Sequence, residues 1–180
     1  MKSAAIVLLT LFVSFCAAAE APPSRVSTFI GTKSISDNTW EPFDSQFEFG
    51  VAADVNIANL PVNFYVGMNA SIDKRDSGDD EGKTVEKLLG VSKHFPIGGS
   101  PFNTYVMGGV AHIEGELTKS SVTQKDSAMG YFVGGGIVWN FTQHFDIGFE
   151  TRYSQAEIKF DDKDVDVGGT HLGVTAGFNW

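Results

Sequence analysis

Cysteine is almost missing from this 180-residue chain, since its one copy, Cys16, lies near the N-terminus. A single cysteine excludes a disulfide scaffold and a multi-cysteine metal site. Basic residues are also few, with 13 Lys and Arg against 22 Asp and Glu, and the net charge of −9 argues against a nucleic-acid partner. No later apolar run has the length of a membrane-spanning helix; residues 131–139 form the longest obvious one and include three glycines.

Phenylalanine and glycine are abundant instead, with 15 and 20 copies. Hydrophobic residues make up 42% of the chain and charged residues 19%, which excludes a disordered polyelectrolyte. Many aromatic residues, many glycines and few charges together indicate a β-rich chain in which backbones approach closely.

The N-terminus has the pattern of a cleavable export signal. Lys2 gives a positive start, residues 4–18 are almost wholly apolar, and residues 17–19 fit an A-x-A cleavage site. We therefore predict a signal peptide over residues 1–19 and one mature domain over residues 20–180.

Apolar and polar residues alternate along most of the mature chain, which is the signature of β-strands with two different faces. The last segment is the cleanest, because Leu172, Val174, Ala176, Phe178 and Trp180 alternate with small or polar residues. The same alternation, strong in some segments and weaker in others, predicts eight strands at residues 25–34, 47–57, 62–72, 84–95, 102–113, 127–139, 145–154 and 171–180.

Short and long connections alternate between these strands. The long ones, residues 35–45, 73–83, 114–126 and 155–166, are polar and have net charges of −3, −2, −1 and −3. Short turns at one end and long loops at the other are the layout of a bacterial outer-membrane barrel, and strands of about ten residues suit a tilted crossing. We therefore predict an all-β fold, an eight-stranded antiparallel up-and-down transmembrane β-barrel.

With its export signal, eight alternating strands and closing residues Gly177–Trp180, the chain resembles the small outer-membrane barrels of the opacity-protein and outer membrane protein A and X type. The resemblance covers about residues 25–180. Family members usually end in Phe, and Trp180 keeps that aromatic character. The resemblance implies a place in the cell outer membrane and contact with its lipid and lipopolysaccharide. We expect no periplasmic peptidoglycan-binding domain after the barrel, since the sequence stops at Trp180. It also implies that the outer-membrane assembly machinery reads the C-terminal strand through Leu172, Val174, Ala176, Phe178 and Trp180. We expect a monomer.

The inward face of the predicted barrel is charged. Strand parity predicts a polar network in the lumen formed by Glu48, Asp54, Glu86, Asp146, Glu150, Arg152 and His171. An eight-stranded barrel has an interior just wide enough for side chains, and buried charges need partners. We therefore expect a filled core in which Arg152 pairs with Glu150, Glu48 or a neighbouring acid. A narrow proton or ion path through this lumen is the alternative.

No catalytic, cofactor-binding or metal-binding residue is predicted. The four histidines are scattered, and no G-x-S-x-G nucleophile motif is present. Asp162, Asp164 and Asp166 resemble the start of a calcium loop, but Val167 stands where the loop needs glycine. We interpret these acids, and those of residues 76–81, as solvated loop charge, with weak divalent-ion binding near lipopolysaccharide as the alternative.

We interpret the protein as a non-enzymatic outer-membrane barrel with a structural or adhesive role, in which the acidic loops form the active surface. A narrow channel, a lipid-A-modifying enzyme and a soluble lipocalin-type barrel are the alternatives. Trp139 and Trp180 are expected in an aromatic girdle at the short-turn rim, and Tyr153 at the outer rim.

Overall fold

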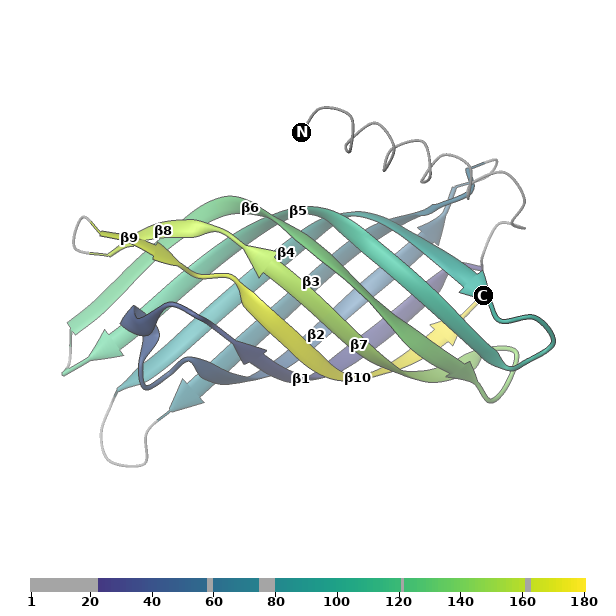
Figure 1. Cartoon of the computed structure of the whole chain (residues 1–180), viewed down its shortest axis with the longest axis horizontal. Helices are drawn as coiled ribbons and strands as arrows, with labels where there is room; N and C mark the ends of the chain where they lie inside the picture. The colour runs from purple at the N-terminus through teal and green to yellow at the C-terminus, as the bar shows by residue number, and fades with distance from the viewer. Residues whose placement is uncertain (1–22, 58–59, 75–79, 121, 161–162) are drawn as a thin grey trace, which may run out of the picture.

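The computed structural model describes residues 23–57, 60–74, 80–120, 122–160 and 163–180. Eight strands close into one antiparallel barrel, in which each strand pairs with its neighbours along the chain and the first pairs with the last (Figure 1). The predicted fold is therefore confirmed. The barrel strands are β1 (Arg25–Ser34), β2 (Ser45–Asn56), β3 (Asn63–Lys74), β4 (Glu81–Pro96), β5 (Phe102–Lys119), β6 (Val122–Asn140), β7 (Phe145–Gln155) and β10 (Gly169–Asn179).

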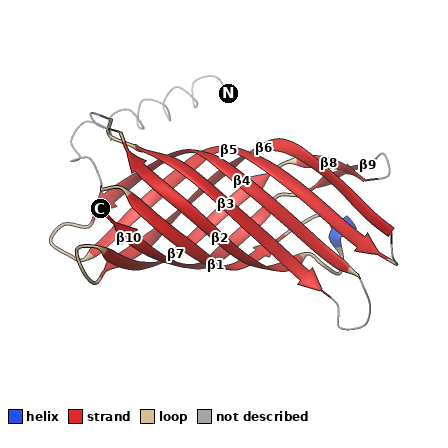
Figure 2. Ribbon diagram, turned by 180° about the vertical axis from the view of Figure 1, so that it is seen from behind, coloured by secondary structure: helices blue, strands red, loops and turns tan. Residues whose placement is uncertain are grey.

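The register of the strands determines the shape of the barrel. The path from Ile30 to its partner on the next strand, and so on from partner to partner around the barrel, reaches Glu114 of β5 in one direction. In the other direction the path reaches Thr104 of β5. These end points are ten residues apart, so the shear number is ten for eight strands. The strands are therefore strongly tilted (Figure 2), and the interior has room for side chains only.

Side chains alternate between the lumen and the outside because successive residues of a strand point to opposite faces. Along β1, for example, Arg25 and Phe29 are buried whereas Val26 and Ile30 are exposed. Large apolar side chains are exposed on every barrel strand. In a membrane barrel this surface is the lipid face, whereas in water it would be an aggregation hazard.

The long connections are more structured than the sequence indicated. Strands β5 and β6 continue far into the third connection, and the fourth contains a separate hairpin of β8 (Glu157–Phe160) and β9 (Lys163–Asp166). The first connection contains a short 3-10 helix, η1 (Asn38–Trp40), which Asp37 caps. The prediction that all four connections are polar loops is therefore wrong in part. The net charge of a connection does not reveal the apolar residues that lie between its charged residues.

Among the described residues, no helix is both long enough and apolar enough to cross a membrane. The predicted signal peptide, with Cys16, lies outside the described residues and stays a prediction.

Candidate functional site: a charged lumen beneath an apolar cap

Arg152 of β7 is at the centre of a buried ionic network. Its Nη2 donates to Glu48 Oε1 at 2.8 Å and its Nη1 to Glu150 Oε1 at 2.9 Å. His171 Nδ1 lies 2.7 Å from Glu48 Oε2, and the Tyr105 hydroxyl donates to Glu150 Oε2 at 2.6 Å. All five side chains are buried. Arg152 thus contacts both carboxylates that the sequence reasoning named for it.

Lys33 of β1 extends the network toward the long-connection end. Its Nζ donates to Glu86 Oε1 at 2.7 Å, to the Val167 carbonyl at 2.8 Å and to Thr84 Oγ1 at 3.0 Å. These three contacts use all three N–H donors of the ammonium group. The sequence analysis missed Lys33, although strand parity places it on the same face as Arg25 and would have identified it.

A second buried pair lies near the short-turn end of the lumen. Arg25 donates from Nη2 to Asp146 Oδ1 at 2.7 Å and from Nε to Asp146 Oδ2 at 3.0 Å. Asn179 Nδ2 also donates to Asp146, at 2.8 Å. Asp54, the remaining predicted member of the lumen set, is buried and accepts a hydrogen bond from Ser92. The seven predicted lumen residues therefore all face inward, in two groups, and the sequence analysis missed the cations Arg25 and Lys33.

Apolar side chains close the lumen at the long-connection end. Trp40 and Phe43 come from the first connection, whereas Ile158 and Phe160 come from β8. The rings of Trp40 and Phe160 lie 5.9 Å apart, and Trp40 is completely buried. We call this cluster the cap; its main members are Ile35, Trp40, Phe43, Leu117, Ile158, Phe160, Val165 and Val167.

Hydrogen bonds join the first connection to β9 in the cap. Trp40 Nε1 donates to the Asp166 carbonyl at 3.0 Å. The Asp37 carboxylate accepts from the backbone N–H groups of Thr39 at 2.9 Å and Asp166 at 3.1 Å. Burial opposes ionisation of Asp37, but these N–H groups outweigh it and hold its pKa below the usual range. The first and fourth connections therefore form one ordered unit.

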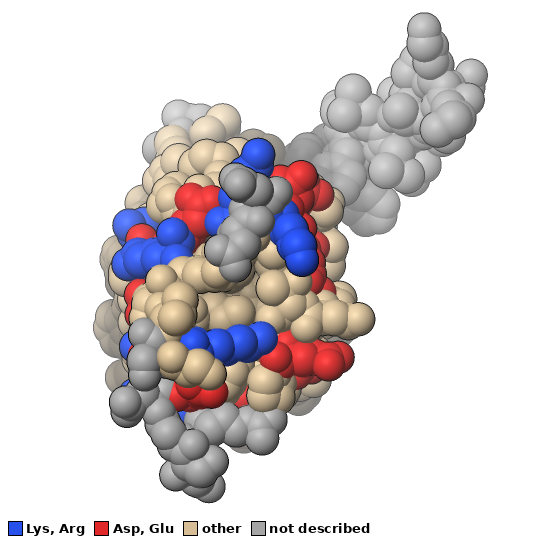
Figure 3. Space-filling view, turned by 90° about the vertical axis from the view of Figure 1, so that its left-hand side faces the viewer, with Lys and Arg blue, Asp and Glu red and all other residues tan. Residues whose placement is uncertain are grey.

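The extended strands carry ion pairs on their outer face. Lys125 Nζ lies 2.9 Å from Glu114 Oε1 and 3.7 Å from Glu116 Oε2. Lys83 lies 3.9 Å from Glu116 and also contacts Glu81. Figure 3, which faces the long-connection end, shows acidic and basic side chains interspersed there. Exposed pairs contribute about 0–1 kcal/mol each, so they arrange surface charge more than they stabilise the fold.

Aromatic side chains gather at the short-turn end of the lipid face. Trp139, Phe141, Phe145 and Phe178 form a chain of ring contacts with centroid distances of 6.1, 6.3 and 5.2 Å. Aromatic belts of this kind occur at membrane–water interfaces. Trp139 thus lies at the end of the barrel where the girdle was expected.

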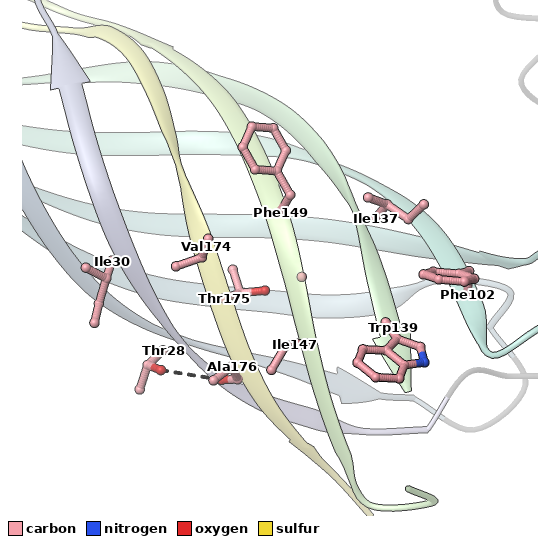
Figure 4. A pocket seen from close by; sticks show the side chains of 11 residues that line it. Thr28, Ile30, Phe102, Ile137, Trp139, Ile147, Phe149, Val174, Thr175 and Ala176 are labelled. Atoms are coloured by element: carbon pink, nitrogen blue, oxygen red, sulfur yellow. Dashed lines mark hydrogen bonds between the residues drawn. The ribbon is translucent and has the colours of Figure 1, made fainter. Parts of the chain in front are cut away.

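A groove of about 470 Å³ lies beside this belt on the lipid face (Figure 4). Its walls include Ile30, Phe149 and Val174, and the hydroxyl of Thr28 is turned to the Ala176 carbonyl at 3.4 Å. The groove therefore presents almost only apolar surface, which suits acyl chains rather than polar ligands.

Within the described residues, no group of three or more His, Cys, Asp or Glu side chains is arranged to hold a metal ion. Asp76, Asp79 and Asp162, which belong to the two acidic clusters considered above, lie outside the described residues.

The apolar outer face, aromatic belt and filled ionic lumen define a class of protein, the transmembrane β-barrel of outer membranes. The family model of the outer membrane protein beta-barrel domain matches residues 3–178, and the chain belongs to that family. It is an outer-membrane protein. No curated protein matches its sequence.

Several solved structures share this fold. Neisserial surface protein A superposes with a TM-score of 0.65 at 14% identity, covering 87% of this chain and 96% of its own. The attachment invasion locus protein Ail of Yersinia pestis has a TM-score of 0.57 at 17% identity and coverages of 88% and 100%. The N-terminal barrel of Pseudomonas aeruginosa OprF has a TM-score of 0.53 at 14% identity and coverages of 89% and 100%. At these identities the likeness concerns the fold alone.

Proposed function

We propose that the barrel is a closed, non-enzymatic membrane anchor and that its outer end carries a structural or adhesive role. The cap is the observation that supports this most, because it covers a lumen already filled by Arg152, Lys33 and their carboxylate partners. Between these ionic groups the lumen has room for side chains only, and a recess of about 310 Å³ at its short-turn mouth is lined by Arg25, His94 and Asp146. Segments displayed on a rigid scaffold are where recognition usually resides.

The excess of acids in the long connections favours a basic partner, or divalent cations that bridge acids to lipopolysaccharide phosphates. Ail of Yersinia pestis has been solved in complex with the heparin analogue sucrose octasulfate, which is a polyanion. The present chain is expected to prefer the opposite charge.

Charge substitutions outside the cap test this preference. Glu157 and Asp164 are exposed on the β8–β9 hairpin, as are Lys159 and Lys163. With an oligolysine peptide as the probe, the double variant E157Q/D164N should bind more weakly than the unmodified protein, and K159Q/K163Q should bind more strongly. Both effects should shrink as salt rises. Equal binding by all three proteins would contradict the proposal.

Substitution is a better test than shortening residues 155–166. That deletion would remove Ile158 and Phe160 from the cap, so a loss of binding would not be separable from a loss of order at the outer end.

The continuous chain of contacts from Lys33 through Glu86, His171 and Glu48 to Arg152 favours a narrow ion path as the second candidate. Single-channel conductance tests this path, because a connected path should give discrete conductance steps that an Arg152 variant loses.

We also propose that the C-terminal strand is the signal read by the assembly machinery and that the protein is a monomer. One face of this segment is exposed and carries side chains that the machinery would recognise together: Leu172, Val174, Ala176, Phe178 and Trp180. Replacing Phe178 with Ser should slow assembly in cells more than refolding in detergent. Equal slowing of both would contradict the signal role.

A further inference from the structure

Two basic residues face outward at the outer edge of the apolar band of the lipid face, next to the outward row that carries Glu114. Lys87 of β4 is exposed and pairs in register with His112 of β5. The same outward row continues to Met68 of β3 and Met129 of β6, both of which are exposed. The next outward row toward the short-turn end carries no charge and consists of Val66, Leu89, Val110 and Tyr131. We call Lys87 and His112 the basic pair.

Lys87 has no ion-pair partner within 4.0 Å among the described residues, unlike the lysines at the outer rim. Glu114 acts electrostatically on both members of the basic pair. Its carboxylate is already engaged, however, because Lys125 Nζ lies 2.9 Å from Oε1. An ionisable side chain on a lipid-facing surface is costly without a partner, and such a residue is a functional candidate.

We propose that the basic pair binds a phosphate group of an outer-leaflet lipid, which in a Gram-negative membrane is a lipid A phosphate of lipopolysaccharide. Lys87 lies nearer to the outer end of β4 at Glu81 than to its other end at Pro96. The flexible stem of a lysine lets the ammonium group rise along apolar surface to the headgroups. An ammonium group and an imidazole N–H both donate hydrogen bonds to phosphate oxygens. This site goes beyond the proposed function, which concerns the outer end.

The surface around the basic pair fits the rest of the same lipid. Val66, Leu89 and Val110 lie directly beneath it on the lipid face and provide contact for acyl chains. A lipid whose phosphate is held at Lys87 therefore places its acyl chains against a continuous apolar surface. The row formed by Val66, Leu89 and Val110 contains no acidic side chain.

Native mass spectrometry of the folded protein in detergent tests the site, with purified lipid A and dephosphorylated lipid A as the probes. The unmodified protein should retain phosphorylated lipid A, and K87Q should lose about tenfold in affinity, as expected for one charge-assisted contact. K87R should keep the binding. K74Q is the matched control, because it removes the same charge from a side chain that is 62% exposed at the outer end of β3, and it should bind as the unmodified protein does.

Heat-modifiable gel mobility confirms that each variant is folded, and K87L, which suits the lipid face, replaces K87Q if the latter does not assemble. Equal binding of lipid A by K87Q and the unmodified protein would overturn the proposal, as would equal binding of the dephosphorylated lipid. Inorganic phosphate should not displace the lipid at equal concentration, because the acyl chains contribute contact. Full displacement would assign the site to free phosphate and refute the lipid assignment.

Discussion

Replacing Trp40 with alanine is expected to open the cap while leaving the barrel assembled. Trp40 is the largest side chain that is completely buried, and it packs against Phe160 with its indole N–H donating to the Asp166 carbonyl. No barrel strand contains Trp40, so the ladder of strand pairs does not depend on it.

The magnitude follows from the buried volume and the hydrogen bond. Truncating a buried Trp to Ala costs about 3–5 kcal/mol, and the lost hydrogen bond accounts for about 1 kcal/mol more. Trp40→Phe keeps most of the packing and should cost about 1–2 kcal/mol. Because the cap is a small unit at one end, much of this loss should appear as local opening rather than as global unfolding.

Limited proteolysis of the folded protein in vesicles measures local opening, and urea unfolding measures the global effect. W40A should be cleaved faster than the unmodified protein in the first and fourth connections while keeping its heat-modifiable mobility. Trp139→Ala is the matched control, since Trp139 is exposed on the lipid face, and it should leave cleavage of these connections unchanged. Unaltered proteolysis of W40A would refute the role assigned to the cap.

Four further predictions follow from the fold and its charges. Arg152→Met leaves two buried carboxylates, Glu48 and Glu150, without their cation and should cost about 3–5 kcal/mol in urea unfolding, whereas a cost below about 1 kcal/mol would contradict the network. Val66→Arg should cost about 2–4 kcal/mol if near the bilayer midplane, against about 0–1 kcal/mol for Arg at the exposed hairpin residue Val122; equal costs would contradict the assigned lipid face. Because the pKa of Asp37 is lowered in the folded state, its contribution to cap stability is complete above its unfolded pKa and is lost as pH falls through the folded value. Proteolysis of the cap should therefore be constant from about pH 8 to pH 5 and rise below about pH 4, and the rise should be weaker in D37N. Finally, mass measurement of the exported protein should show cleavage after residue 19, and retention of the first 19 residues would contradict the signal peptide.

The barrel was predictable because its determinants are local and periodic. Alternation along a segment such as Leu172–Trp180 reports directly which side chains face lipid, and the alternating connection lengths report the up-and-down topology. The lumen set followed from the same parity, which is why residues as distant as Glu48 and Arg152 were expected on the same inner surface. Lys33 and Arg25 obey this parity too, so both were predictable although the sequence analysis missed them.

The cap was not predictable in the same way. Trp40, Phe43 and Ile158 come from two connections that are far apart in sequence, and no single period relates them. The net charge of the two connections suggested solvated loops. The burial of Trp40, Phe43 and Ile158 depends instead on how the first connection folds onto the β8–β9 hairpin. The basic pair was predictable in part. The sequence shows Lys87 between Val85 and Leu89 on the outward face of its strand, but only the strand register places His112 beside it.

Single-channel recording in planar bilayers tests the central claim, that this barrel is closed by its ionic lumen and its cap, most directly. The purified protein, shown to be folded by its heat-modifiable mobility, should insert without producing discrete conductance steps. Reproducible steps from the folded protein that disappear in an Arg152 variant would contradict the closed anchor and assign the function to the lumen.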